Sequence, residues 1–151
     1  MNKILKLLIS FYIFFLTSSF ALSKESFFEE ALKLYENKKY DDALFLFERN
    51  IVLNPKDAKS YLFLAKIYNH EDNQRKEEYN LETTLLIEPN NEDALLMSMK
   101  IALKKSNYTK VKELSEIFIK VCSNLCLENK KIQETLKNIE PENNESWSKS
   151  W

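Results

Sequence analysis

The sequence predicts an all-α protein: a short right-handed α-solenoid of about three helix-turn-helix repeats with a C-terminal capping helix. Three observations favour this fold class. The 151-residue chain has no glycine and three prolines, a composition that disfavours tight hairpin turns and suits long helices. Apolar residues recur at steps of three and four, which is helical spacing. Finally, Pro55 and Pro89 end two helical stretches in the same way, and this interval of about 34 residues, here called the repeat length, is typical of two-helix repeats.

The first 21 residues are expected to be a signal peptide. They contain Lys3 and Lys6, then an apolar run over residues 7–16, and they end with small residues at Ser19 and Ala21 that suit signal peptidase. An uncleaved membrane anchor is the alternative, but the run is shorter than the roughly 20 residues that a spanning helix needs. The protein is therefore expected to be exported, and periplasmic or secreted.

The rest of the chain is long enough for one compact domain with a hydrophobic core. Loss of Lys3 and Lys6 would take the formal charge from −1 to −3, and acidic and basic residues are interspersed. No basic face for a nucleic acid is expected. Contact with a membrane is expected only through an N-terminal segment that escapes cleavage. With nucleic acid and membrane set aside, the expected partner is a protein or peptide.

The first repeat is predicted over residues 22–57 as a helical hairpin. The polar stretch ENKKYDD separates its two helices, and Asp41 is well placed to cap the second one. Asn54-Pro55 then ends that helix. The apolar residues of the first helix and then of the second are Phe27, Phe28, Ala31, Leu32, Leu34 and Tyr35, followed by Ala43, Leu44, Phe47, Ile51 and Val52.

The same repeat length continues through a second repeat over residues 58–91 and a degenerate third repeat over residues 92–124. The third repeat has no closing proline. Each helical pair exposes an apolar face that it cannot bury alone, so the pairs are expected to stack. Chemistry is kept at several pairs of positions that lie one repeat length apart: Leu53 and Ile87, Pro55 and Pro89, and Tyr61 and Leu95.

The last helical pair has an apolar face that no further repeat covers, and residues 125–140 are expected to cover it as an amphipathic capping helix. Its apolar face carries Leu125, Ile132, Leu136 and Ile139, while its other face is rich in Lys, Glu and Asn. Residues 141–151 have no apolar periodicity and are expected to be a flexible tail. The tail holds the only tryptophans, Trp147 and Trp151, which could anchor a partner, fold back into the groove or have no role.

These units resemble the tetratricopeptide repeat (TPR) family. Glu77 departs from the pattern, because the family has a small apolar residue there, and Met99 departs in the same way in the third repeat. The matching residues are Phe27, Ala31, Tyr40, Ala43, Phe47 and Pro55 in the first repeat, Tyr61, Leu64, Ala65, Tyr68, Leu81, Thr84 and Pro89 in the second, and Leu95, Ala102, Tyr108, Val111 and Phe118 in the third.

The resemblance implies a non-catalytic scaffold for protein-protein interaction, which for an exported chain points to envelope assembly or a periplasmic complex. No cofactor is expected. The family's binding surface is the concave face, lined mainly by the first helix of each repeat, and in this chain it would be apolar at one end and basic at the other. The alternatives are that these side chains complete the core, or that the tail or a second copy covers them. The corresponding residues are Phe28, Leu32, Tyr35, Leu62, Lys66, Asn69, Leu96, Lys100 and Lys104.

Cys122 and Cys126 are the only cysteines and lie in KVCSNLCLE, where the third repeat passes into the capping helix. In an exported chain such a pair suggests a structural disulfide. A continuous helix would strain the bridge, but a break at Ser123-Asn124 could bring the Cα atoms to about 5.5 Å. The alternative function is thiol redox or metal handling by this pair, although no histidine or methionine follows closely.

No catalytic set is recognisable in the sequence. His70 is the sole histidine, in the turn segment NHEDN, and one histidine offers too few ligands for zinc. Acidic pairs such as Glu77-Glu78 look like helix caps and solvent-facing charges. The protein is therefore not expected to be an enzyme, and no metal site is expected at His70.

Overall fold

The computed structural model describes residues 27–139; the predicted signal peptide and the predicted tail lie outside this part of the chain. The described residues form seven α-helices and no strand. None of these helices has the length and apolar character needed to cross a membrane. The helices are α2 (Phe27–Glu36), α3 (Tyr40–Leu53), α4 (Ala58–His70), α5 (Gln74–Ile87), α6 (Glu92–Lys104), α7 (Tyr108–Val121) and α8 (Cys126–Ile139).

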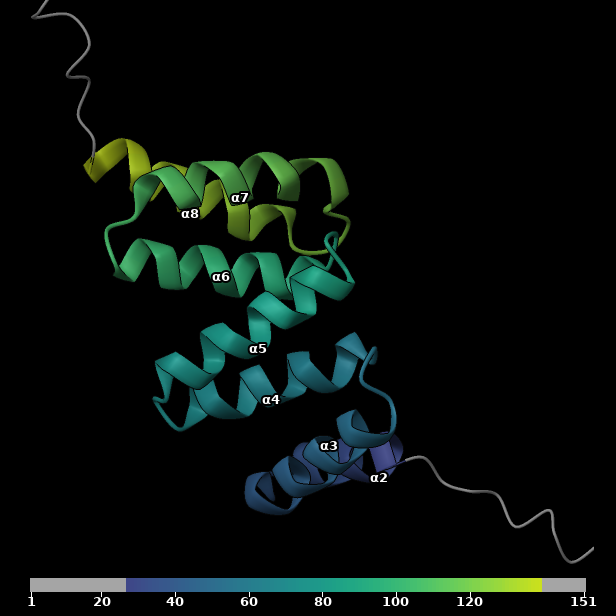
Figure 1. Cartoon of the computed structure of the whole chain (residues 1–151). Coiled ribbons are helices and arrows are strands. Elements are labelled where there is room, and N and C mark those ends of the chain that lie inside the picture. The colour runs from purple at the N-terminus through teal and green to yellow at the C-terminus, as the bar shows by residue number, and fades with distance from the viewer. Residues whose placement is uncertain (1–26, 140–151) are drawn as a thin grey trace, which may run out of the picture.

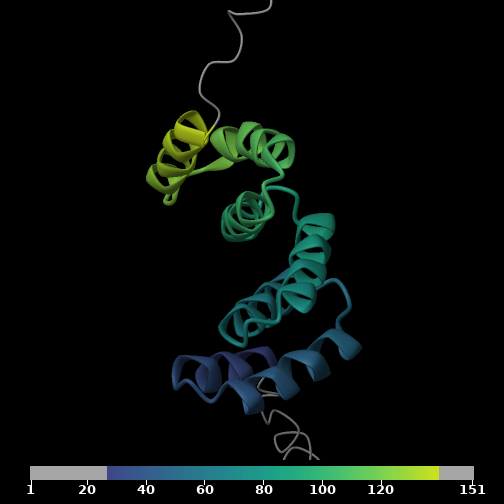
Figure 2. The same cartoon turned by 90° about the vertical axis from the view of Figure 1, so that its left-hand side faces the viewer.

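The helices pair in sequence order and stack into a curved array (Figure 1). The pairs α2/α3, α4/α5 and α6/α7 follow one another, and α8 packs on the last pair through contacts with both α6 and α7. Seen from the side, the array bends into a C shape with α2 and α8 at its two ends (Figure 2). The predicted fold class, an all-α solenoid of helical repeats, is confirmed.

The turn inside each repeat has the same backbone conformation. Lys38, Asp72 and Ser106 are the described residues with positive φ, at 59°, 55° and 55°, and each lies one repeat length from the next. The next residue in each turn donates its N–H to a carbonyl five residues earlier, which is the closing hydrogen bond of a Schellman motif. These bonds run from Lys39 to Leu34, from Asn73 to Tyr68 and from Asn107 to Ala102, at 2.9, 2.9 and 2.8 Å.

Glycine at these turn positions should stabilise the protein. A residue with a Cβ pays about 1–2 kcal/mol of steric strain in the left-handed conformation. Glycine avoids this strain, but it loses more chain entropy on folding, which offsets part of the gain. We expect Lys38→Gly and Ser106→Gly each to raise the free energy of unfolding by about 0.5–1 kcal/mol. Asp72→Gly should gain less, because aspartate tolerates this conformation better. Urea denaturation of the three variants measures the change in the free energy of unfolding for each. A loss of stability in Ser106→Gly would contradict the prediction.

Three helices begin with an asparagine cap. Asn91, between the second and third repeats, accepts a hydrogen bond from the N–H of Ala94, and Asn73 and Asn107, in the turns inside these repeats, cap α5 and α7 in the same way. The expected cap at Asp41 is wrong, because α3 already begins at Tyr40 and its N-cap residue Lys39 makes no side-chain cap bond. Asp41 instead lies in the first turn of α3, where a negative charge is favourable.

The core consists of three clusters, each joining neighbouring repeats. The first has aromatic side chains at its centre, the middle one has only aliphatic side chains and methionine, and the third extends under α8. Their buried members are Ala31, Ala43, Phe47, Leu64, Ile67 and Tyr68 in the first, Leu62, Ala65, Leu81, Ala94 and Ile101 in the middle, and Leu95, Leu96, Met99, Ala102, Val111, Phe118, Ile132 and Leu136 in the third.

Candidate functional site

A cavity of about 380 Å³ opens where the first helices of the three repeats meet. Five of the predicted concave-face residues line it together: one from α2, two from α4 and two from α6. We call this cavity, with all the residues that line it, the concave site. The lining residues are Tyr35, Lys66, Asn69, Glu77, Met97, Lys100, Ile101 and Lys104.

Three lysines and one glutamate line the concave site. The Lys66 Nζ atom lies 2.9 Å from the Asp93 carboxylate, so its charge is largely paired. Lys100 and Lys104 are exposed, and within the described residues no carboxylate lies at ion-pair distance from either. These two side chains are therefore available to an anionic partner.

One edge of the concave site is aromatic. The Tyr35 ring lies 5.0 Å from Phe63 and 5.5 Å from Tyr40, measured between ring centroids. Phe63 in turn contacts Phe28, with centroids 5.9 Å apart, and Lys66 lies over the Phe63 ring at 5.2 Å. Burial raises the pKa of Tyr35, and nearby Tyr40 and Asp93 add to the effect, so its hydroxyl stays neutral and can donate a hydrogen bond.

Glu77 of α5 also lines the concave site and is only 4% exposed. Asn69 donates a hydrogen bond of 2.9 Å from its side-chain amide to the Glu77 carboxylate. Burial raises the pKa of Glu77, while this hydrogen bond and the charge of Lys104 partly oppose the shift. A carboxylate is thus kept at a position where the repeat family has a small apolar residue.

Glu77→Gln should stabilise the protein at neutral pH, because glutamine can still accept from Asn69 and carries no charge to bury. A raised pKa means that folding favours the protonated acid, so the wild type loses stability as the pH rises from about 4.5 through the raised value. We expect the variant to be more stable at pH 7, by up to about 1 kcal/mol, and the gap to close below pH 4.5. Denaturation midpoints at the two pH values test this; a less stable variant at pH 7 would mean that attraction to Lys104 dominates.

Two predicted site residues do not belong to an open surface. Leu62 and Leu96 are each 6% exposed and are members of the middle and third core clusters. Their position in the repeat, which Phe28 shares, faces neighbouring helices. Phe28 and Leu32 are half-buried at the N-terminal end of the array, and Phe28 packs on Phe47 with centroids 5.7 Å apart.

Sequence reasoning missed three residues that line the concave site: Glu77, Met97 and Ile101. The sequence did contain a signal for Glu77, because a glutamate stands where the repeat pattern has a small apolar residue. It also contained one for Met97, which lies one repeat length after Phe63 and so occupies the same place in the repeat. Ile101 is 5% exposed and has the sequence character of an ordinary core residue.

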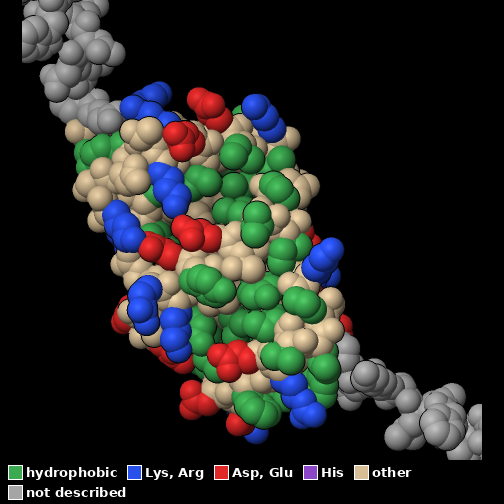
Figure 3. Space-filling model, in the orientation of Figure 1, with side chains coloured by type: hydrophobic (Ala, Val, Ile, Leu, Met, Phe, Trp, Pro, Cys, Tyr) green, Lys and Arg blue, Asp and Glu red, His purple; other side chains and the backbone are tan. Residues whose placement is uncertain are grey.

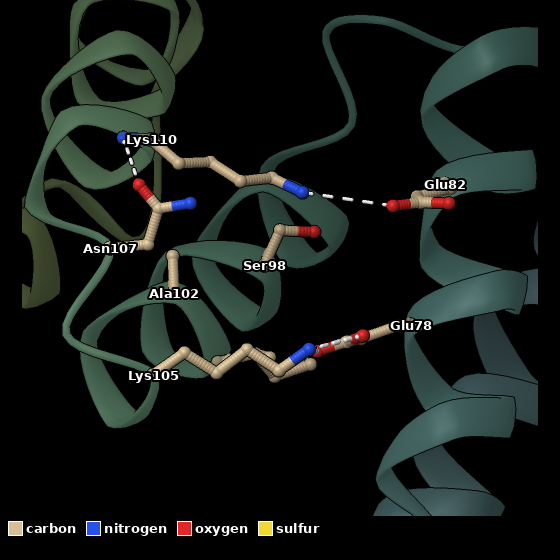
Figure 4. Close-up of a pocket in the computed structure, with 8 residues that line it drawn as sticks. Glu78, Glu82, Ser98, Ala102, Lys105, Asn107 and Lys110 are labelled. Carbon is tan, nitrogen blue, oxygen red and sulfur yellow. Dashed lines mark hydrogen bonds and ion pairs between the residues drawn. The ribbon is translucent and has the colours of Figure 1, made fainter.

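A second, smaller cavity of about 210 Å³ lies between α5 and the α6/α7 pair. Lys105 extends toward Glu78 and donates a hydrogen bond of 2.7 Å, and Lys110 points at Glu82 across 3.7 Å (Figure 4). These ion pairs bridge the second and third repeats. Its two lysines are paired with its two glutamates, so this cavity has fewer free charges for a charged ligand than the concave site has.

The opposite, convex face carries exposed apolar side chains. Helices α3, α5 and α7 lie in front in Figure 1, and hydrophobic side chains form a band on this face (Figure 3). Phe45 and Val52 of α3, and Tyr79 and Leu86 of α5, are 61–83% exposed and occupy the same two places in successive repeats. The third repeat has Glu113 and Lys120 there, so at these two places the apolar surface is confined to the first two repeats.

Cys122 and Cys126 are joined by a disulfide in the turn between α7 and α8, with Cα atoms 5.4 Å apart. Helix α7 ends at Val121 and α8 begins at Cys126, so the helix is broken between the cysteines. The Glu92 carboxylate accepts four hydrogen bonds from the three residues between the two cysteines, three from backbone N–H groups and one from a hydroxyl. The donors are Ser123 N and Oγ, Asn124 N and Leu125 N, at 2.6, 2.7, 3.2 and 3.2 Å.

Glu92 has a strongly stabilised negative charge in this turn. The hydrogen bond from the Ser123 hydroxyl contributes most to lowering its pKa, and the backbone N–H groups of Ser123, Asn124 and Leu125 add to it. Among the described residues no group of three or more His, Cys, Asp or Glu side chains could hold a metal ion.

No protein-family profile matches the sequence, and no curated protein matches it either. Solved structures do match. The Sgt2 TPR domain from Aspergillus fumigatus superposes with a TM-score of 0.60 and 20% identity, over 79% of this chain and 86% of that one. This chain has a TPR fold.

Two further structures with a similar fold contain complexes. The type III secretion chaperone SycD of Yersinia enterocolitica, in complex with a peptide of the translocator YopD, matches with a TM-score of 0.64 and 15% identity, over 76% of this chain and 90% of that one. The CopN-Scc3 complex gives a TM-score of 0.59 and 14% identity, over 82% of this chain and 74% of the matched chain. At these identities the likeness concerns the TPR fold alone.

Proposed function

We propose that this TPR chain is a non-catalytic scaffold that binds a segment of a partner protein in the concave site. The observation that carries the proposal is the meeting of Tyr35, Asn69, Lys100 and Lys104 around one cavity, although they come from three repeats. A peptide with an aromatic or aliphatic anchor could pack against the aromatic edge, while its acidic groups contact the two unpaired lysines. The SycD structure, which contains a peptide of the translocator YopD, supports the proposal that a chain of this fold binds a peptide.

We further propose that the chain acts after export, in envelope assembly or a periplasmic complex. Support comes from the basic start, apolar run and small residues of the first 21 positions. N-terminal sequencing of the protein from cells tests this directly. A mature chain that begins at Leu22 supports export, and an intact Met1 in the cytosolic fraction contradicts it.

The binding proposal is tested by crosslinking in native envelopes, followed by affinity measurement with the partner segment recovered. A photoreactive group at Tyr35 should crosslink to a recurrent protein, and the double variant Lys100→Glu/Lys104→Glu should weaken binding at least about tenfold, or about 1.4 kcal/mol. The matched control Lys56→Glu/Lys59→Glu makes the same charge change at exposed positions outside the concave site. Equal loss in both double variants would contradict the concave site and indicate a general charge effect.

A further inference from the structure

Helix α8 is the first half of a fourth repeat. Helices α4, α6 and α8 begin at Ala58, Glu92 and Cys126, so each begins one repeat length after the last. In the second and third repeats, a second helix packs on the first. Among the described residues no helix follows α8 to do the same, so one face of α8 lies open at the end of the solenoid.

A cavity of about 430 Å³ lies on this open face, between α7 and α8; we call it the end cavity. The disulfide and Ile119, which is 61% exposed, form part of its wall. Its surface is largely apolar. The lining residues are Ile119, Cys122, Cys126, Asn129, Lys130, Gln133, Glu134 and Lys137.

The repeat register explains why this surface is hollow. Three lining residues of α8 are polar, whereas the equivalent residues on α6, one repeat length earlier, belong to the third core cluster or pack against it, together with side chains of α7. Asn129 and Gln133 instead hydrogen-bond to Ser115 of α7, and among the described residues no further helix fills this repeat interface. The three pairs of equivalent residues are Leu95 and Asn129, Met99 and Gln133, and Leu103 and Lys137.

We propose that the end cavity is occupied by the chain's own residues 140–151, through Trp147 and Trp151. This segment follows α8 directly, and its tryptophans are its only large apolar side chains. Indole rings bury more apolar area than any other side chain and suit a pocket of this size.

The reach of the segment is sufficient. Helix α8 has 14 residues and is about 21 Å long. Trp147 lies eight positions after Ile139, and an extended chain covers roughly 26 Å over eight positions. Trp147 can therefore return along the whole of α8, and Trp151 can reach the disulfide.

The charges are complementary as well. The segment carries Glu140, Glu142 and Glu145 against a single Lys149. Lys130 and Lys137 line the end cavity, and within residues 27–139 no carboxylate lies at ion-pair distance from either. Acidic residues that flank the tryptophans would meet these two lysines on the way into the cavity.

Tryptophan fluorescence tests this proposal cleanly, because the chain has no other tryptophan. The protein retaining residues 140–151 is compared with a free synthetic peptide of the same residues, and the variants Trp147→Phe and Trp151→Phe separate the two signals. We expect emission at shorter wavelength than in the peptide, and a lower acrylamide quenching constant for at least one tryptophan. Emission and quenching equal to those of the peptide in both variants would overturn the proposal.

Matched variants then locate the docking site. Ile119→Asp should abolish the emission shift, while Leu127→Asp should preserve it, because Leu127 is on α8 and 69% exposed but does not line the end cavity. If Ile119→Asp fails to fold by circular dichroism, Lys130→Glu/Lys137→Glu should release the tryptophans at low salt. A shift that survives both variants overturns the site, and a shift lost on dilution assigns the tryptophans to a second copy and overturns the intramolecular contact.

Discussion

Phe47→Ala is expected to have the largest effect on stability, a loss of about 3–5 kcal/mol. Phe47 is fully buried and stacks on Phe63 with ring centroids 5.3 Å apart, and it also contacts Phe28 at 5.7 Å. It joins the first repeat to the second within the first core cluster. Truncation leaves a cavity between two repeats that the rigid helices can close only in part.

The loss should also change how the protein unfolds. A repeat array is stabilised by interfaces between neighbours, so a weakened first interface releases the terminal repeat before the others. Hydrogen exchange should show α2 and α3 losing protection first, with α6 and α7 unchanged. Phe45→Ala is the control on the same helix; its side chain is 61% exposed, so we expect a change within about 0.5 kcal/mol. Equal effects in the two variants would contradict the assigned core.

Removal of the disulfide should have the second largest effect. The bond between Cys122 and Cys126 spans a sequence separation of four residues, and the chain-entropy relation gives about 2 kcal/mol for a loop this short. The third inter-repeat turn has Ser123 where the first two have Pro55 and Pro89, so the crosslink restricts a turn that lacks proline. We expect Cys122→Ser/Cys126→Ser to destabilise α8 and the end of α7 by this amount.

Reduction of the wild type should reproduce the double cysteine variant. Exchange of amides in α8 should accelerate in both, while α2 to α4 keep their protection and binding at the concave site persists. If reduction leaves exchange in α8 unchanged, the four bonds to Glu92 hold the turn without the crosslink. Loss of partner binding in the double variant would instead favour thiol chemistry as the function.

The sequence was sufficient for the fold because its signals are local and repeated. Proline at two equivalent positions, small residues such as Ala31 and Ala65, and apolar spacing all indicate stacked helix pairs. The positive-φ residues Lys38, Asp72 and Ser106 could not be found in this way, because they have no chemistry in common. Only the backbone shows that their three turns are identical.

The concave site was predictable in part. Helical spacing tells which residues share a face, and Tyr35, Lys66 and Lys100, which it assigns to one face, line one cavity. It does not tell which neighbouring helix covers that face, so it left open whether Leu62 belongs to the surface or to the core, where both it and Leu96 lie. Glu92 illustrates the same limit: its carboxylate holds a turn 31–33 residues further along the chain, and no local pattern indicates that contact.

The middle core cluster joins the second repeat to the third. It contains no aromatic ring, and both the concave site and the smaller cavity border it at Ile101. Three ion pairs cross the same junction, from Lys66 to Asp93, from Lys105 to Glu78 and from Lys110 to Glu82, so it is held by charge as well as by apolar packing. Tyr35 of the first repeat and Lys100 of the third line one cavity, so the concave site is complete only when all three repeats are stacked.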